Sequence, residues 1–348
     1  MQVYFLVFLH LLQSLFSPCD TQFNNKSSSA NLVFQSLDGG NTWKDVSGNL
    51  PKGIGINSAF ESHGELLLAT DKGVYGGDAT SELIQWKVDQ VLGKSISTIS
   101  NGWAGPYAIS YGNGVYQKII GTSIWVPMDK SLGDKMVRTI LEIPGGIVFI
   151  ASDNGIYKSM DGRKTWKKVF SEGMVLGLME NDGVLFAAGF KGVLKSVNGG
   201  EQWDWVFTED GMAFYTGMID GRLTAITSGM GPWGMEKSAP FGIKTNRLRT
   251  SVDGGRTWQR ADAGLSNALF NQDLLKKNMQ NGVQFRPSAI KDIDQLGEYL
   301  YCSLDAGLFR SADHGITWQL IFSADDNKSF ETVIFGKSIY VVSVFSGC

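Results

Sequence analysis

The sequence has few of the residues that bind metals or activate water. The three histidines and three cysteines of the 348-residue chain are His10, His63, His314, Cys19, Cys302 and Cys348. This number of possible ligands argues against a Cys/His zinc site. It also leaves little material for a Ser-His-Asp hydrolase. We therefore expect no metal and no cofactor.

The chain also lacks an excess of basic residues. It contains 31 Lys and Arg against 34 Asp and Glu, which gives a formal net charge of −3. A nucleic-acid-binding domain usually carries a clear basic surplus, so we expect no nucleic-acid partner. Proline is scarce, at 8 residues, whereas glycine is abundant, at 43, and tryptophan reaches 10. This combination favours short strands joined by many turns.

The N-terminus carries one apolar run, residues 3–16, that is too short to cross a bilayer, which needs about 20 residues. Its length fits the central part of an export signal, although no Lys or Arg precedes it. We expect an export signal over 1–18 and a flexible tether rich in Asn and Ser over 19–30. The sequence before Cys19 loosely resembles a bacterial lipoprotein cleavage site, with Pro18 as a departure, so Cys19 is a candidate lipidation site. The alternative is an ordinary cysteine.

A repeated segment runs through the rest of the chain. Its shared form, called the box below, is Ser-x-Asp-x-Gly-x-Thr-Trp. The five copies are residues 36–43, 159–166, 196–203, 251–258 and 311–318. Three departures occur, with Asn198 in place of Asp, Gln202 in place of Thr and Arg163 in place of Gly. These segments resemble the Asp-box, or BNR, repeat.

A second signature precedes the box and consists of Gly, two apolar or aromatic residues, a basic residue and Ser. Complete examples begin at Gly155, Gly192 and Gly307, each eleven positions before the box tryptophan. Two further copies, at Gly73 and Gly114, lead to a tryptophan without a box. The chain therefore contains seven repeats, of which two lack the box.

The spacing of the seven tryptophans predicts a closed ring. They are Trp43, Trp86, Trp125, Trp166, Trp203, Trp258 and Trp318. The gaps between them are 43, 39, 41, 37, 55 and 60 residues, and the wrap-around gap from Trp318 to Trp43, counted from residue 31, is again 43. Seven units therefore close without a spare end.

Each unit of about 40 residues is predicted to hold four short strands. In one unit these are 137–142, 147–152, 156–159 and 166–170, separated by Gly-rich turns and the box. We therefore expect an all-β fold over 31–348, a seven-bladed β-propeller with four-stranded antiparallel blades. The last blade would combine C-terminal strands 332–335 and 339–344 with N-terminal strands 32–36 and 43–45, so that both ends of the chain share it.

The box residues are assigned a structural role. An Asp or Asn side chain accepts hydrogen bonds from its own turn, and a tryptophan buries its ring between blades. The residues concerned are Asp38, Asp161, Asn198, Asp253, Asp313, Trp43, Trp166, Trp203, Trp258 and Trp318. Because they would lie far apart around the periphery, they cannot converge on one substrate.

Two long gaps identify insertions at about 228–246 and 264–287, the second with a short helix expected over 267–280. Both would leave the propeller on the same face, where long loops commonly carry function. Together with arginines expected near the central channel, they supply the candidate binding residues Trp233, Met235, Phe241, Phe270, Phe285, Arg286 and Arg138. The alternative is that the predicted helix only covers the Trp233 loop.

Asp-box propellers include sialidases, whose site needs three clustered arginines, and no such triad is visible in the sequence. Another glycosidase would need two carboxylates about 5–10 Å apart. The candidates near the channel are Glu142, Glu209, Asp210, Asp220, Asp292 and Asp294, with Glu142 toward the opposite face. No motif pairs any two of them.

The repeat pattern over residues 31–348 is more similar to photosystem II assembly/stability-factor-like propellers and to blades of the sortilin ectodomain. This resemblance implies a non-catalytic binding or assembly module with a protein or peptide partner. We expect an exported monomer that contacts membranes only through a lipid anchor, with Cys302 and Cys348 unpaired. The alternative is a carbohydrate-active enzyme that uses carboxylates at the channel mouth, with a glycan as ligand.

Overall fold

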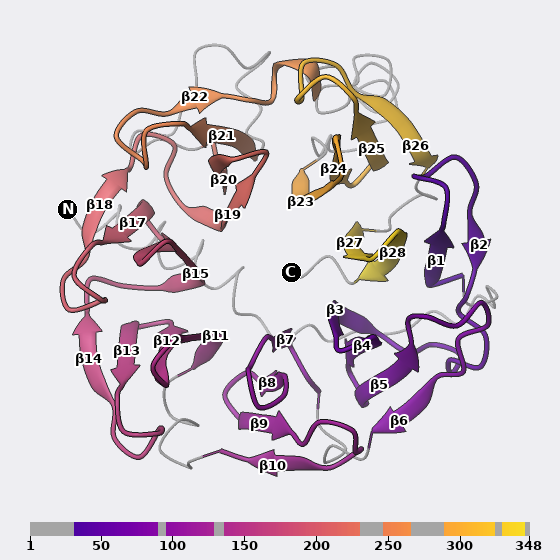
Figure 1. Ribbon diagram of the computed structural model, residues 1–348, viewed down its shortest axis with the longest axis horizontal. Coiled ribbons are helices and arrows are strands. Elements are labelled where there is room, and N and C mark those ends of the chain that lie inside the picture. Colours follow the sequence, from indigo (N-terminus) through magenta and orange to yellow (C-terminus); the bar gives the residue numbers. More distant parts are fainter. Residues whose placement is uncertain are drawn as a thin grey trace, which may run out of the picture.

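The computed structural model describes residues 31–89, 95–128, 136–229, 246–265, 289–323 and 329–344. Over these ranges the chain forms seven four-stranded antiparallel sheets, which are arranged as blades around one axis (Figure 1). The predicted seven-bladed propeller is confirmed. No helix in the described part of the chain is long and apolar enough to cross a membrane.

The blades are numbered I to VII, and six of them use four consecutive strands from the axis outward. Blade I contains β3 (Ile56–Ser62), β4 (Glu65–Thr70), β5 (Gly73–Asp78) and β6 (Lys87–Asp89). Blade II contains β7 (Thr98–Ser100), β8 (Tyr107–Ser110), β9 (Gly114–Lys118) and β10 (Trp125–Pro127). Blade III contains β11 (Val137–Ile143), β12 (Ile147–Ser152), β13 (Gly155–Ser159) and β14 (Lys167–Phe170). Blade IV contains β15 (Val175–Asn181), β16 (Val184–Gly189), β17 (Gly192–Ser196) and β18 (Asp204–Phe207).

Blades V and VI follow the same order, and the 3₁₀ turn η3 (Ala263–Leu265) lies after blade V. Blade V contains β19 (Ala213–Ile219), β20 (Arg222–Thr227), β21 (Arg247–Ser251) and β22 (Gln259–Arg260). Blade VI contains β23 (Ile290–Leu296), β24 (Tyr299–Leu304), β25 (Gly307–Ser311) and β26 (Gln319–Ser323).

Blade VII is built from both ends of the chain, as predicted. It contains β27 (Ser329–Phe335), β28 (Ser338–Val344), β1 (Val33–Ser36) and β2 (Lys44–Asp45). The N-terminal strand β1 pairs antiparallel with β28, from Val33 opposite Val342 to Ser36 opposite Ile339. This pairing closes the ring and gives every blade a neighbour on both faces.

The second strand of a blade is apolar almost throughout. Five of the six residues of β4, β12 and β16 are buried. A strand that packs against neighbouring sheets on both faces needs apolar side chains on both faces, so the period-two alternation of a surface strand disappears. The outermost strands β2 and β22 are exposed and polar.

The boxes form turns with the predicted hydrogen bonds. In blade V, Asp253 Oδ1 accepts from the backbone N–H of Arg256 (3.0 Å) and Thr257 (2.9 Å), and the Thr257 hydroxyl donates to Asp253 Oδ2 (2.6 Å). These donors, with the Thr257 hydroxyl first, lower the pKa of Asp253. Asn198 accepts from the N–H of Gln202 in the same way (3.0 Å), so the substituted box keeps its turn.

The box tryptophans join each blade to the one before it. The indole of Trp43 packs edge-on against Phe322 of blade VI, with ring centres 5.1 Å apart, and its N–H donates to Ile321 O (3.0 Å). The indole N–H also donates to the carbonyl of the second box glycine, Gly40 (3.1 Å). Where Arg163 replaces that glycine, the indole N–H of Trp166 is buried without a hydrogen-bond partner in the described residues.

The glycine that opens the second signature is required by a close backbone approach. Gly155, Gly192 and Gly307 have φ values of 130°, 140° and 137°. A Cβ at Gly155 would lie 1.9 Å from the carbonyl oxygen of Phe170, and the other two glycines face equivalent contacts. A residue with a side chain does not fit there, which explains the constant spacing between this glycine and the tryptophan.

We expect replacement of Ser251 by alanine to lower the free energy of unfolding by about 1–2 kcal/mol. The buried Ser251 hydroxyl donates to Asp253 Oδ1 (2.8 Å) and accepts from the N–H of Gly255 (2.9 Å), which would lose its partner. Urea unfolding measures the change. The control is Val252→Ala, because Val252 is 74% exposed. Equal effects of both substitutions would contradict a structural role for the box serine.

Candidate functional site: the axial ring

The innermost strands of five blades carry one extra residue at the same place. The pairing of the first two strands skips one residue of the inner strand in blades I, III, IV, V and VI. Each skip is a β-bulge, which leaves the extra residue unpaired and redirects its side chain. The five extra residues are Asn57, Arg138, Leu176, Phe214 and Lys291.

These five residues, called the axial ring, surround the axis of the propeller. The inner strands lie nearest to the axis and have a partner strand only on their outer side (Figure 1). An extra residue on such a strand therefore lies on the edge of the blade that is nearest to the axis. Every bulge is near the beginning of its strand, which places the ring on the face where second strands end and third strands begin. That face carries the chain at Thr227 and Arg247, which flank the first predicted insertion.

Arg138 is held in a defined position by three neighbours. Its Nε lies 2.7 Å from Asp153 Oδ1, its Nη2 donates to the Tyr111 hydroxyl (3.2 Å), and the guanidinium lies 4.3 Å from the Tyr111 ring centre. Burial, followed by a hydrogen bond to Asp153, raises the pKa of Tyr111 to about 12. The Arg138 side chain remains 28% exposed. The guanidinium is thus paired with Asp153, held in one orientation and still partly open to solvent.

The rest of the axial ring combines apolar and polar groups. Phe214 is 42% exposed, although it is a large aromatic residue. Lys291 pairs with Asp305 (3.3 Å), and the amide of Asn57 donates to Ile96 O (2.7 Å). Exposed aromatic and arginine side chains are enriched at protein-binding surfaces.

Most of the predicted binding residues lie outside the described residues. These are Trp233, Met235, Phe241, Phe270, Phe285 and Arg286, together with the helix expected over 267–280. Cys19 and Cys348 lie outside them as well, and Cys302 is a free, buried cysteine. Of the predicted binding residues, Arg138 lies within the described residues. The other four residues of the axial ring, Asn57, Leu176, Phe214 and Lys291, are not predicted from the sequence.

The candidate catalytic carboxylates are distributed over both faces. Glu142 lies toward the opposite face, where it accepts from the N–H of Trp103 (2.6 Å) and pairs with Arg163 (3.3 Å). Asp220 is the other candidate on this face. It lies in the β19–β20 turn, directly after an inner strand, and its carboxylate contacts His314 (2.8 Å).

Two other candidate carboxylates, Asp210 and Glu209, lie on the face of the axial ring. Asp210 forms an ion pair with Arg249 and accepts from the Thr227 hydroxyl (3.2 Å). Glu209 is exposed beside it. An aspartate held by an arginine and a hydroxyl in this way stabilises the blade, and neither residue faces a second free carboxylate.

Asp292 and Asp294 are the only two of these candidates, among the described residues, that the fold brings together. They stand two positions apart on β23, share a hydrogen bond and are half-buried. Burial, and then the charge of Asp292, raises the pKa of Asp294 well above its usual value. Glu331 on β27 lies close by, and burial raises its pKa to about 8. Carboxyl groups in hydrogen-bond contact are closer than the separation of about 5–10 Å that glycosidases use.

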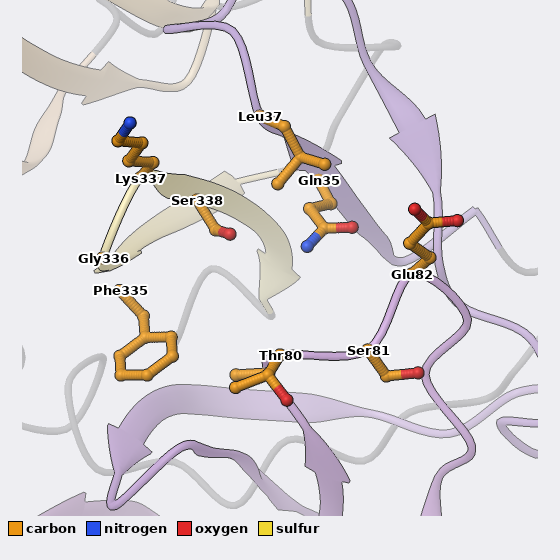
Figure 2. A pocket seen from close by; sticks show the side chains of 10 residues that line it. Gln35, Leu37, Thr80, Ser81, Glu82, Phe335, Gly336, Lys337 and Ser338 are labelled. Atoms are coloured by element: carbon orange, nitrogen blue, oxygen red, sulfur yellow. The ribbon is translucent and has the colours of Figure 1, made fainter.

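The described residues also form two hollows beside blade I, on the face opposite to the axial ring. The smaller, of about 170 Å³, lies between blades VII and I. Figure 2 shows Thr80, Ser81 and Glu82 on one side of it and Phe335, Lys337 and Gln35 around the rest. The larger, of about 930 Å³, lies between blades I and II.

Comparison with known proteins supports the fold alone. No protein-family model and no curated protein matches the sequence. Among solved structures, the chain is similar to YCF48 bound to D1 peptide (TM-score 0.57, 15% identity, 86% of this chain and 95% of that one). It is also similar to an ancestral GH74 enzyme (0.56, 15%, 85% and 48%) and to the extracellular domain of a one-component system from B. thetaiotaomicron (0.56, 11%, 84% and 39%). The chain thus spans about half of the GH74 enzyme, and its likeness to these proteins is that of a shared propeller fold.

Proposed function

We propose that this protein is a non-catalytic binding or assembly module whose axial ring contacts a protein or peptide partner. The observation that carries the proposal is the repeated bulge, which places five residues of mixed chemistry on the inner strands around one axis. Bulges are over-represented next to functional sites, where they redirect a side chain. The 228–246 and 264–287 insertions would extend the same surface.

Three further observations support this function. The box turns match the hydrogen-bonding role expected of an Asp-box repeat, a class in which we place the chain. A propeller of similar length, YCF48, is described in complex with a peptide. Of the candidate carboxylates, Glu142 and Asp210 are paired with arginines, and Asp292 and Asp294 share a hydrogen bond. We further propose export through residues 1–18, with Cys19 as the point of attachment if the chain is lipid-anchored.

A photo-crosslinking experiment in the source organism tests the proposal. The full chain carries a photoreactive phenylalanine analogue at position 214, and the matched control carries it at position 252, on an exposed box turn of the same blade. We expect a defined protein adduct from position 214 and none from position 252. Arg138→Gln should reduce the yield of this adduct about tenfold, because arginines at the centre of an interface often dominate binding.

Thermal unfolding of each variant verifies that the propeller is intact. No adduct at position 214, or the same adducts at both positions, would contradict the axial ring as the contact surface. An adduct that is unaffected by Arg138→Gln would leave the surface in place but remove the role of the cation.

A further inference from the structure

Exposed apolar side chains are distributed unevenly over the propeller. Four of them, Leu37, Met160, Val197 and Val252, are each the second residue of a different box and are therefore isolated from one another. Six others lie in the outer parts of blades I and II, namely Leu83, Val88, Ile119, Ile120, Ile124 and Val126. The remaining seven are distributed over other parts of the described residues. A concentration of exposed apolar residues is a mark of an interaction surface.

The same two blades enclose the larger hollow, called the I–II groove. It has a volume of about 930 Å³ and is lined by parts of β4, β5, β6 and the two connections that replace the missing boxes. Leu83 and Val88 line it and are 67% and 52% exposed. Thr80 and Ser81 line both this groove and the smaller cavity of Figure 2, so the β5–β6 connection is the ridge between them. The groove thus lies where the repeat has lost its regular turn.

The base of the I–II groove contains a buried ion cluster. Lys118 Nζ lies 2.6 Å from Glu65 Oε2 and 2.7 Å from Asp89 Oδ2, and the side chains of Lys118 and Asp89 are almost fully buried. The indole N–H of Trp125 also donates to Asp89 Oδ2 (3.1 Å). The charge of Lys118 is therefore compensated inside the protein. Glu65, in contrast, keeps 36% of its side chain exposed toward the groove.

The lining of the groove has an excess of negative charge. Its carboxylates are Glu65, Asp78 and Asp89, against the ammonium groups of Lys87 and Lys118. Hydrogen bonds from the Thr80 hydroxyl and backbone lower the pKa of Asp78, which keeps it ionised. This excess of one carboxylate favours a cationic ligand over an anionic one. None of the lining residues is Phe, Tyr or Trp, and the imidazole of His63 is the one aromatic ring among them.

We propose that the I–II groove binds an extended segment of a partner protein that places a Lys or Arg side chain next to Glu65, between apolar residues that cover Leu83 and Val88. The basic group compensates the exposed carboxylate, and the apolar flanks remove the exposed surface of the rim from water. This surface is on the face opposite to the axial ring and is separate from it. The protein would thus have two contact surfaces.

Binding of three peptide pools to the full chain tests this inference. Each fluorescein-labelled octapeptide pool has randomised apolar residues around a fixed central Lys, norleucine or Glu, and fluorescence anisotropy gives the affinity. We expect the Lys pool to bind about tenfold more tightly than the norleucine pool, and the Glu pool to bind most weakly. Glu65→Gln should remove most of this preference, and Asp78→Asn should reduce it about threefold.

The apolar rim has its own variants. The double variant Leu83→Ser/Val88→Ser should lower the affinity for the Lys pool and for the norleucine pool equally, by about tenfold. Val252→Ser should leave both affinities unchanged. Glu65→Gln removes one partner of Lys118 and can prevent folding. Asp78→Asn then still measures how much a groove carboxylate contributes to the preference for Lys. Absence of binding by any pool, equal binding of the Lys and Glu pools, or a preference that survives both carboxylate variants would overturn the inference.

The outcome is independent of the axial ring. Phe214→Ala should not change the affinity of any pool, since Phe214 lies on blade V. Pool binding that is lost in Phe214→Ala and retained in the Leu83/Val88 variant would place the peptide on the axial ring and overturn the groove. Groove binding without a crosslink at position 214 would uphold this inference and contradict the function proposed above.

Discussion

Replacing Tyr340 with alanine is expected to lower the free energy of unfolding by about 4 kcal/mol. The side chain is fully buried where blade VII meets blade I. Its hydroxyl accepts from the Gln35 amide (2.8 Å) and donates to Ala79 O (2.7 Å). These contacts connect the N-terminal strand β1, the C-terminal strand β28 and blade I. Alanine would leave a cavity and two buried polar groups without partners at the point where the ring closes.

Two further variants separate the ring from the hydroxyl. Tyr340→Phe keeps the aromatic ring and should cost only about 1–2 kcal/mol. Tyr299→Ala, at a tyrosine that is 41% exposed, should cost less than about 1 kcal/mol. Urea unfolding with a common slope compares the three variants. If Tyr340→Ala is no more destabilising than Tyr299→Ala, closure through Tyr340 is not a main source of stability.

The second large effect is a dependence of stability on pH that arises from Glu331. Burial, and also the nearby charge of Asp292, raises the pKa of this carboxyl from 4.5 to about 8, although its Oε2 accepts from the N–H of Ala59 (2.9 Å). The folded protein therefore binds a proton that the unfolded chain releases above pH 4.5. The corresponding stability is fully present below pH 4.5 and is lost as the pH rises toward 8.

Glu331→Gln should remove this dependence. Glutamine keeps an acceptor for Ala59 but cannot ionise, so the variant should be about 2–3 kcal/mol more stable than the wild type at pH 9 and similar to it at pH 4. Asp292 and Asp294 have raised pKa values as well and contribute in the same direction, which leaves a residual slope in the variant. Urea unfolding between pH 4 and pH 9 measures it.

The matched control for this experiment is Glu298→Gln, at an exposed glutamate of the same region. Its stability curve should follow that of the wild type over the whole range. Parallel curves for the wild type and Glu331→Gln would mean that Glu331 is already ionised in the folded protein near neutral pH.

The strands were predictable because their determinants are local. The unit at 137–170 folds as predicted to within about one residue at each strand end. Its turns are fixed by glycines, and Gly155 has a backbone conformation (φ 130°) that residues with a side chain rarely adopt. The role of the box followed from short-range hydrogen bonds as well, because Asp253 and its donors lie within four residues.

The axial ring was predictable only in part. Arg138 was selected because an arginine near the beginning of an inner strand can face the axis. Phe214 and Leu176 were not selected, because in the sequence they are apolar residues in apolar strands, and nothing local distinguishes a bulged residue from a buried one. In five blades the inner strand contains one residue more than the stretch of the second strand with which it pairs. This difference can be recognised only when the pairing of the two strands is known.

By itself, the sequence determined the number of blades, the strand order within each blade, the turn chemistry and the closure of the ring by both ends of the chain. The strand order and the turn chemistry depend on interactions within one repeat, and the number of blades and the closure follow from the repeat period, because the two ends together supply one unit. Only the tertiary structure decided which carboxylates meet and where hollows form. Glu331 contacts Ala59 across 272 positions, and Lys118 contacts Glu65 across 53. Such pairs depend on how neighbouring blades pack. The alternation of apolar and polar residues distinguishes the two faces of a strand, but it does not predict which residues of another blade each face contacts.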